Sequence, residues 1–86
     1  MKTFEDIEFK DHPNLSGVVG RMYFENGYGV SVVRTIYSYG GRDGLYELAV
    51  LNKDGQITYD TPVTSDVLGY LTPEEVTEYM KQVQSL

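Results

Sequence analysis

Short runs of strand-forming residues, separated by turn residues, fill most of the chain. The runs cover residues 7–10, 17–25, 28–37, 45–51 and 56–59. Asn26-Gly27 separates the second run from the third, and Asn52-Lys53-Asp54-Gly55 follows the fourth. Such turn residues between β-prone runs are typical of hairpins. The pattern predicts an antiparallel meander of four to five strands.

The apolar residues change period at the carboxyl end. Thr72 supplies an N-cap hydroxyl, Pro73 suits the first helical position, and Glu75 completes a capping box. Apolar residues then recur at spacings of three or four, at Val76, Tyr79, Met80, Val83 and Leu86. This spacing predicts a helix over residues 73–84 that covers one face of the sheet. The fold class expected is α+β, with a short helical turn over residues 66–71.

Length and composition point to one small domain spanning residues 1–86. No repeat, low-complexity tract or linker divides the chain. The absence of cysteine excludes disulfides, thiolate metal sites and cysteine nucleophiles. No apolar run approaches the roughly 18 residues of a membrane span, and the amino end leads into acidic residues. We therefore expect a soluble, cytoplasmic protein that makes no membrane contact.

The charge balance favours protein partners over nucleic acid. Asp and Glu number 13 against 7 Lys and Arg, a formal net charge of −6. Such a chain repels phosphates at long range, so we expect no direct binding of DNA or RNA. The acidic clusters at both ends could mimic nucleic acid, or they could be ordinary solvated faces.

The Asn26-Gly27 turn also predicts which side chains share a face. A two-residue loop pairs the strands as Glu25/Tyr28, Tyr23/Val30, Arg21/Val32 and Val19/Arg34 on one face, and as Phe24/Gly29, Met22/Ser31, Gly20/Val33 and Val18/Thr35 on the other. The second face carries no charge and is the predicted core. The first places Arg21 and Arg34 close together.

Two guanidinium groups beside phenol rings suit an anion, a carboxylate or a nucleotide base. The glycine-rich loop over residues 40–44 could bring Arg42 to the same place. Alternatively, the arginines pair with Glu25, Glu47 or other local acids on a half-exposed sheet face, which implies no function. The candidate binding residues, for a protein or a ligand, are Arg21, Tyr23, Tyr28, Arg34, Tyr37, Tyr39, Arg42 and Asp43.

Tyrosine is abundant, with eight residues and no tryptophan. Tyrosine is enriched both in strands and in protein-binding surfaces. We expect the last three, Tyr59, Tyr70 and Tyr79, to be partly in the core. Tyr28, Tyr37 and Tyr39 are expected to have a free face.

The sequence offers little for catalysis. His12 is the only histidine and precedes Pro13 in a predicted turn. The carboxylates and hydroxyls of residues 60–66 favour turns for local reasons, and residues 52–55 lack the alternating acids of a calcium loop. We expect no enzyme activity, no catalytic residue, no metal and no cofactor.

Several segments carry a resemblance to a known group of proteins: residues 24–34, Tyr39-Gly40-Gly41, residues 44–50, residues 59–64 and residues 66–71. In the arrangement of these segments, the chain resembles small uncharacterised accessory proteins of tailed bacteriophages. The resemblance covers roughly residues 7–86 and implies a setting, the cytoplasm of an infected host. Small acidic phage proteins of this kind often inhibit or modulate host enzymes, including anti-CRISPR and other anti-defence proteins.

The leading hypothesis is therefore a non-enzymatic protein that binds, and inhibits or modulates, a host or phage protein such as a defence or nucleic-acid enzyme. The alternative is a binder of a small molecule, such as a sponge for a nucleotide signal, that uses Arg21, Arg34 and the loop over residues 40–44. A homodimer is open in either case, because an exposed edge strand could pair across a twofold axis.

Overall fold

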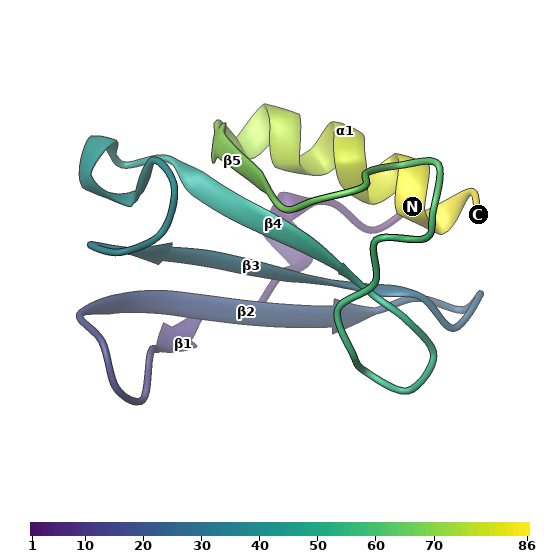
Figure 1. Ribbon diagram of the computed structural model, residues 1–86, viewed down its shortest axis with the longest axis horizontal. Coiled ribbons are helices and arrows are strands. Elements are labelled where there is room, and N and C mark those ends of the chain that lie inside the picture. Colours follow the sequence, from purple (N-terminus) through teal and green to yellow (C-terminus); the bar gives the residue numbers. More distant parts are fainter.

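The protein, described by a computed structural model of residues 1–86, consists of a sheet with one helix against it (Figure 1). The sheet is antiparallel, and its strands follow the order of the chain. They are β1 (Lys10–Asp11), β2 (Gly17–Tyr23), β3 (Gly29–Thr35), β4 (Tyr46–Leu51) and β5 (Leu68–Leu71). The helix α1 (Pro73–Gln84) follows the last strand, and 3-10 turns η1 (Phe4–Asp6) and η2 (Gly41–Asp43) complete the elements. The predicted α+β class is confirmed.

Local signals define the start of α1. The Thr72 hydroxyl accepts a hydrogen bond from the Glu75 backbone N–H at 3.2 Å, and the Glu75 carboxylate accepts one from the Thr72 N–H at 3.1 Å. This is the predicted capping box, and the bounds of α1 match the predicted residues 73–84. Three of the predicted stripe residues, Val76, Met80 and Val83, are fully buried.

The main core cluster lies on one side of the sheet. Its buried members are Ile7, Val30, Val32, Leu48, Val50, Leu71, Val76, Met80 and Val83. The amino-terminal segment covers this side together with α1, and in Figure 1 it passes behind the sheet. Its close approach requires a glycine beneath it, because a Cβ at Gly20 would collide with the Ile7 side chain. The rings of Phe4, Phe9 and Tyr46 pack together, with centroids 5.0–5.6 Å apart.

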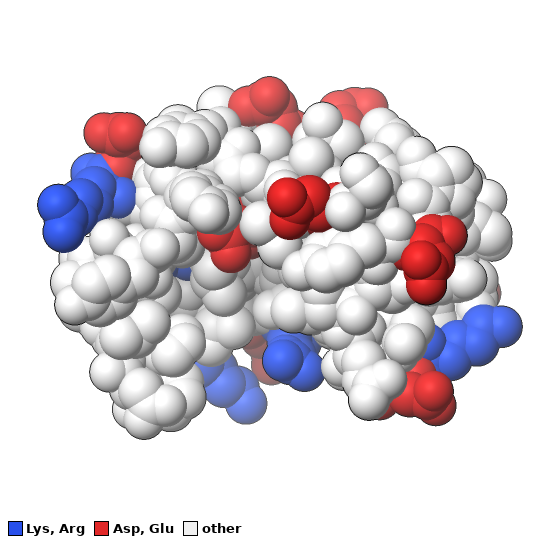
Figure 2. All heavy atoms as spheres, viewed as in Figure 1, with Lys and Arg blue, Asp and Glu red and all other residues white.

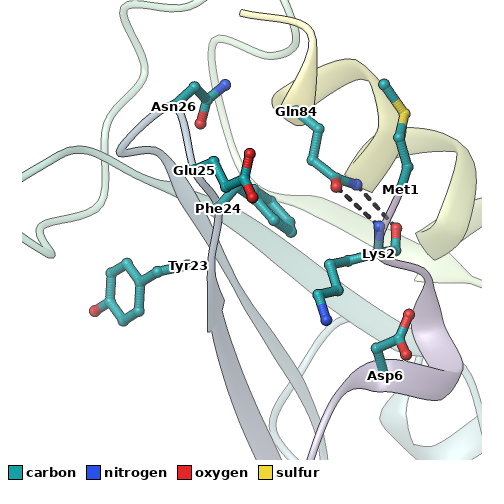
Figure 3. A pocket seen from close by; sticks show the side chains of 8 residues that line it. All are labelled: Met1, Lys2, Asp6, Tyr23, Phe24, Glu25, Asn26 and Gln84. Atoms are coloured by element: carbon teal, nitrogen blue, oxygen red, sulfur yellow. Dashed lines mark hydrogen bonds between the residues drawn. The ribbon is translucent and has the colours of Figure 1, made fainter.

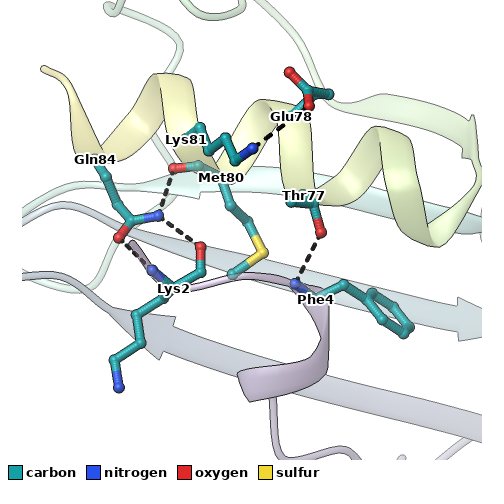
Figure 4. A network of polar contacts seen from close by, with 7 residues as sticks. All are labelled: Lys2, Phe4, Thr77, Glu78, Met80, Lys81 and Gln84. Carbon is teal, nitrogen blue, oxygen red and sulfur yellow. Dashed lines mark hydrogen bonds and ion pairs between the residues drawn. The ribbon is translucent and has the colours of Figure 1, made fainter.

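Polar contacts tie the amino-terminal segment to α1 (Figure 4). The Phe4 N–H donates to the Thr77 hydroxyl at 3.0 Å. The Gln84 amide accepts from the Lys2 N–H at 2.9 Å and donates to the Lys2 carbonyl at 2.8 Å. Helix and amino-terminal segment therefore form a joint cover over one face of the sheet.

The hairpin between β2 and β3 does not have the predicted register. Tyr23 lies opposite Gly29, Arg21 opposite Ser31 and Val19 opposite Val33, one residue away from the expected pairing. Phe24 and Tyr28 close a three-residue loop, since the Phe24 N–H donates to the Tyr28 carbonyl at 2.8 Å. One residue of slip turns every side chain of β3 to the other side of the sheet.

The predicted core is therefore correct for β2 and the residue that follows it, and wrong for β3. Met22 and Phe24 pack against the core as expected, but Val30 and Val32 are the buried residues of β3. Val33, predicted to be in the core, lies opposite Val19 on the other side of the sheet.

Asn26 explains the longer loop. Gly27 has a φ of 91°, whereas Asn26 keeps a negative φ, so residues 25–27 form a turn with a glycine bulge rather than a two-residue loop. The Asn26 side chain donates to the Val83 carbonyl at 2.9 Å and accepts from the Tyr28 N–H at 3.0 Å. The last carbonyls of a helix lack partners within the helix. Asn26 thus joins the hairpin to the end of α1.

Three further expectations are corrected. Residues 66–71, predicted as a helical turn, contain strand β5, which pairs with β4 through Leu48 and Tyr46. The predicted strand over residues 7–10 is reduced to β1, because Ile7 instead enters the core. The strand predicted over residues 56–59 is a single bridge between Ile57 and Leu51.

No helix of the structure combines the length and the apolar character needed to cross a membrane.

Replacing Asn26 with alanine tests its role. The variant loses the bonds to Val83 and Tyr28, so we expect the free energy of unfolding to fall by about 1–2 kcal/mol in chemical denaturation. Asn14→Ala is the matched control, since this exposed residue makes no side-chain hydrogen bond, and its effect should stay below about 0.5 kcal/mol. Equal stability of the two variants would contradict the role assigned to Asn26.

Candidate functional site

The structure separates the two arginines that the predicted register brought together. Arg34 lies on the covered side, because it follows Val32 by two residues along β3. Its guanidinium donates to the Tyr46 hydroxyl at 3.3 Å and lies 5.3 Å from the centre of that ring. Arg21 is exposed on the opposite side of the sheet. The pair cannot hold one anion between them.

Neither arginine pairs with an acid, contrary to the alternative interpretation. The one ion pair of the structure joins Lys81 and Glu78 at 3.8 Å on α1. Glu47 instead accepts a hydrogen bond from the Tyr39 backbone N–H at 3.0 Å. Arg21 is therefore an exposed cation whose charge is unmatched within the chain.

The side of the sheet that carries Arg21 has no helix over it, and we call it the open face. The register assigns to it Val19, Arg21, Tyr23, Ser31, Val33, Glu47, Ala49 and Leu51, with Lys10 at its outer edge. Val19, Ser31 and Val33 are half-buried, and Ala49 and Leu51 are buried. The residues between Arg21 and Glu47 are thus small or apolar, and Ala49 and Leu51 are already covered within the chain.

Tyr23 closes one end of the open face. Its ring lies over Gly29, where a Cβ would come within 2.9 Å of the ring. Its hydroxyl reaches the turn after β4, since a Cβ at Gly55 would stand 3.1 Å from the hydroxyl oxygen. The side chain nevertheless remains 53% exposed, so much of the ring is available to a partner.

Tyr39 and Tyr70 lie at the other end, beside a bulge in β5. Tyr46 pairs with Leu71 and Leu48 with Leu68, so Gly69 and Tyr70 together oppose Glu47. Tyr39 packs on Gly69, where any Cβ would collide with that of Tyr39, and its carbonyl accepts from the Tyr70 N–H at 3.1 Å. Tyr39 is 60% exposed and Tyr70 is 59% exposed.

Tyr70 holds an unusual backbone conformation. Its φ is 57°, and it is the one residue other than glycine with a positive φ. A bulky side chain in this region costs of order 1–3 kcal/mol and persists where the surrounding structure imposes it. Residues in such backbone conformations cluster at functional sites. No sequence pattern marks it, because tyrosine ordinarily avoids this conformation.

The remaining candidate residues are dispersed. Tyr28 is half-buried against the core, and Lys53 lies over its ring at 6.0 Å. Tyr37 is 71% exposed in the turn after β3. Arg42 donates from its Nε to the Ile36 carbonyl at 3.3 Å, and Asp43 ends η2. Arg42 is thus held against the backbone of the segment that follows β3.

The tyrosine expectations are met only in part. Tyr79 is half-buried against the core, and Tyr37 and Tyr39 are exposed, as predicted. Tyr59 and Tyr70, expected to be partly in the core, are largely exposed. Tyr28, expected to have a free face, packs on the core because the register differs.

A hollow of about 600 Å³ lies between the hairpin end, the amino-terminal segment and α1 (Figure 3). Sequence reasoning did not find it. Two of its polar side chains, Gln84 and Asn26, already serve the fold through their bonds to Lys2 and Val83. The charged side chains of the lining are Lys2, Asp6 and Glu25.

His12 has a local structural role. Its Nδ1 accepts hydrogen bonds from the backbone N–H groups of Asn14 at 3.2 Å and Leu15 at 3.1 Å. The nitrogen is therefore occupied in organising the turn before β2. No group of three or more His, Asp or Glu side chains stands close enough together to hold a metal ion.

Comparison of the chain with protein-family models, with curated proteins and with solved structures found no match. The assignment of a surface therefore depends on the geometry alone, and the resemblance to phage accessory proteins stays a prediction.

Replacing Tyr70 with asparagine tests the strain. Asparagine tolerates a positive φ, so we expect the variant to be more stable by about 1 kcal/mol in chemical denaturation. Tyr37→Asn, another exposed tyrosine but with an ordinary φ, is the control and should change stability by less than about 0.5 kcal/mol. A greater loss of stability in Tyr70→Asn than in Tyr37→Asn would contradict the strain assigned to Tyr70.

Proposed function

We propose that the chain is a non-enzymatic protein-binding domain whose contact surface is the open face. The observation that carries the proposal is the contrast between the two sides of the sheet. One side is covered by α1 and the amino-terminal segment, while the other presents exposed tyrosines around an apolar centre. Antiparallel sheets can leave one face to water, but such a face is ordinarily polar.

The composition of the open face supports docking. Tyr23, Tyr39 and Tyr70 offer large contact areas on side chains with few rotatable bonds, so a partner can bury them at low entropic cost. Viewed from this side, most of the surface is uncharged, and acidic and basic side chains are scattered over it (Figure 2).

The setting remains the one implied by the resemblance. A phage accessory protein of this size would act by occupying a surface of a host or phage enzyme. Inhibition or modulation of a defence or nucleic-acid enzyme is the outcome that we propose for such docking.

Affinity capture with paired variants tests the proposal. Ser31→Glu places a carboxylate at the centre of the open face, directly opposite Arg21, so the fold has a favourable cross-strand pair. Gln82→Glu adds the same side chain on the exposed surface of α1. In host lysate at low salt, the tagged wild-type chain and Gln82→Glu should retain the same protein, and Ser31→Glu should lose it.

Circular dichroism confirms that both variants are folded before capture. Titration calorimetry with the purified partner should then show at least about tenfold weaker binding for Ser31→Glu alone, because docking buries its charge. Retention of the same partner by all three baits, or of none by any, would overturn the proposal.

A further inference from the structure

The tip of the hairpin between β2 and β3 carries a chemically labile dipeptide. Asparagine is among the residues that degrade most readily in proteins. The backbone nitrogen of the following residue attacks its side chain, and glycine at that position has no Cβ to obstruct the approach. Asn26-Gly27 is the one Asn-Gly pair of the chain, since the other asparagines stand in Asn14-Leu15 and Asn52-Lys53.

In the folded chain, the groups that take part in this reaction are all hydrogen-bonded. The Gly27 N–H, which contains the attacking nitrogen, donates to the Phe24 carbonyl at 3.0 Å. The Asn26 amide nitrogen, which is the leaving group, donates to the Val83 carbonyl at 2.9 Å. The Asn26 amide oxygen accepts from the Tyr28 N–H at 3.0 Å. The side chain is thus fixed between its own loop and the end of α1.

We propose that Asn26-Gly27 is a site of intramolecular deamidation, which the fold holds back and which proceeds when the hairpin separates from α1. The Gly27 nitrogen attacks Cγ of Asn26, and a bond forms between them. The bond from Cγ to Nδ2 breaks, and the amide nitrogen leaves as ammonia with the proton that the Gly27 nitrogen gives up. The product is a five-membered succinimide.

Water then opens the succinimide ring at one of its two carbonyl groups. Attack at one carbonyl leaves an aspartate at position 26, and attack at the other leaves an isoaspartyl residue, in which the chain runs through Cγ. In total, one water is consumed and one ammonia is released for each amide converted to a carboxylate. The reaction needs no oxidant, metal or second protein.

Both products weaken the contact between the hairpin and α1. An aspartate at position 26 can still accept from the Tyr28 N–H, but its carboxylate has no hydrogen to donate to the Val83 carbonyl. Its negative charge instead faces the carboxyl end of a helix, where the helix dipole is also negative. The isoaspartyl product adds one carbon to the backbone of the loop that determines the pairing of β2 with β3.

The reaction is therefore a one-way consequence of opening. Local openings of a native protein ordinarily close again without change. An opening of this hairpin exposes the dipeptide, and a chain that deamidates while it is open cannot restore the bond to Val83 on closing. The site is separate from the open face, so the inference does not depend on the proposed function.

Peptide mapping by mass spectrometry provides the test. The wild-type chain is incubated at neutral pH in buffer and, in parallel, in guanidinium chloride that unfolds it. Conversion of Asn26 to the aspartyl and isoaspartyl forms should be at least about tenfold faster in guanidinium chloride, because the hydrogen bonds of the folded hairpin are then absent. Asn14 and Asn52 of the same molecules are internal controls, and both should stay unmodified while Asn26 is converted.

Two variants examine the route and its consequence. Gly27→Ala, incubated in guanidinium chloride, should slow the conversion of Asn26, because the added methyl group obstructs the attacking nitrogen. Asn26→Asp reproduces one product and should unfold at a lower denaturant concentration than the wild type. Asn14→Asp adds the same charge at an exposed residue whose side chain makes no hydrogen bond, and should leave the unfolding midpoint unchanged.

Equal rates of conversion in buffer and in guanidinium chloride would overturn the inference, because the fold would then hold nothing back. The absence of conversion at Asn26 in the unfolded chain would remove the site itself. An Asn26→Asp variant as stable as the wild type would also overturn the inference, since deamidation would then leave the hairpin and α1 joined.

Discussion

The hydrogen bonds of one asparagine organise this fold. Asn26 stands at the tip of the first long hairpin, where its side chain binds the Val83 carbonyl near the end of α1 and the Tyr28 N–H within its own loop. These contacts favour a three-residue loop, and the loop decides the pairing of β2 with β3. The hairpin and the last turn of α1 therefore share one side chain, and a slip of one residue would exchange the two faces of β3.

The chemistry of the surface follows from that pairing. Val30 and Val32 turn towards α1, and Arg34 lies on the same side against Tyr46. Arg21 is left on the open face. The register of a two-residue loop would have brought Arg21 and Arg34 together as an anion site. In the observed register, this surface is a largely uncharged sheet bordered by tyrosines. Such a surface suits a protein partner better than a small anion, because it offers area rather than a cluster of donors.

Sequence reasoning succeeded where the determining contacts are local. The capping box at Thr72 and the stripe from Val76 predicted α1 to the residue, because caps and period act within a few positions. It failed where the contact is distant: the Asn26 partner lies 57 residues away, and Asn-Gly alone favours the shorter loop. Strand β5 escaped detection for a related reason. Its bulge has a positive φ at Tyr70, and Tyr39, 31 residues earlier in the chain, packs on Gly69 and accepts a hydrogen bond from the Tyr70 N–H.

The pairing of β2 with β3 is the central claim, because the core and the open face both derive from it. Contacts between backbone protons, measured by nuclear Overhauser spectroscopy on the isotope-labelled chain, report that pairing directly. Cross-strand contacts should link Arg21 with Ser31 and Val19 with Val33. Contacts that link Arg21 with Val32 and Val19 with Arg34 instead would contradict the three-residue loop and, with it, the open face.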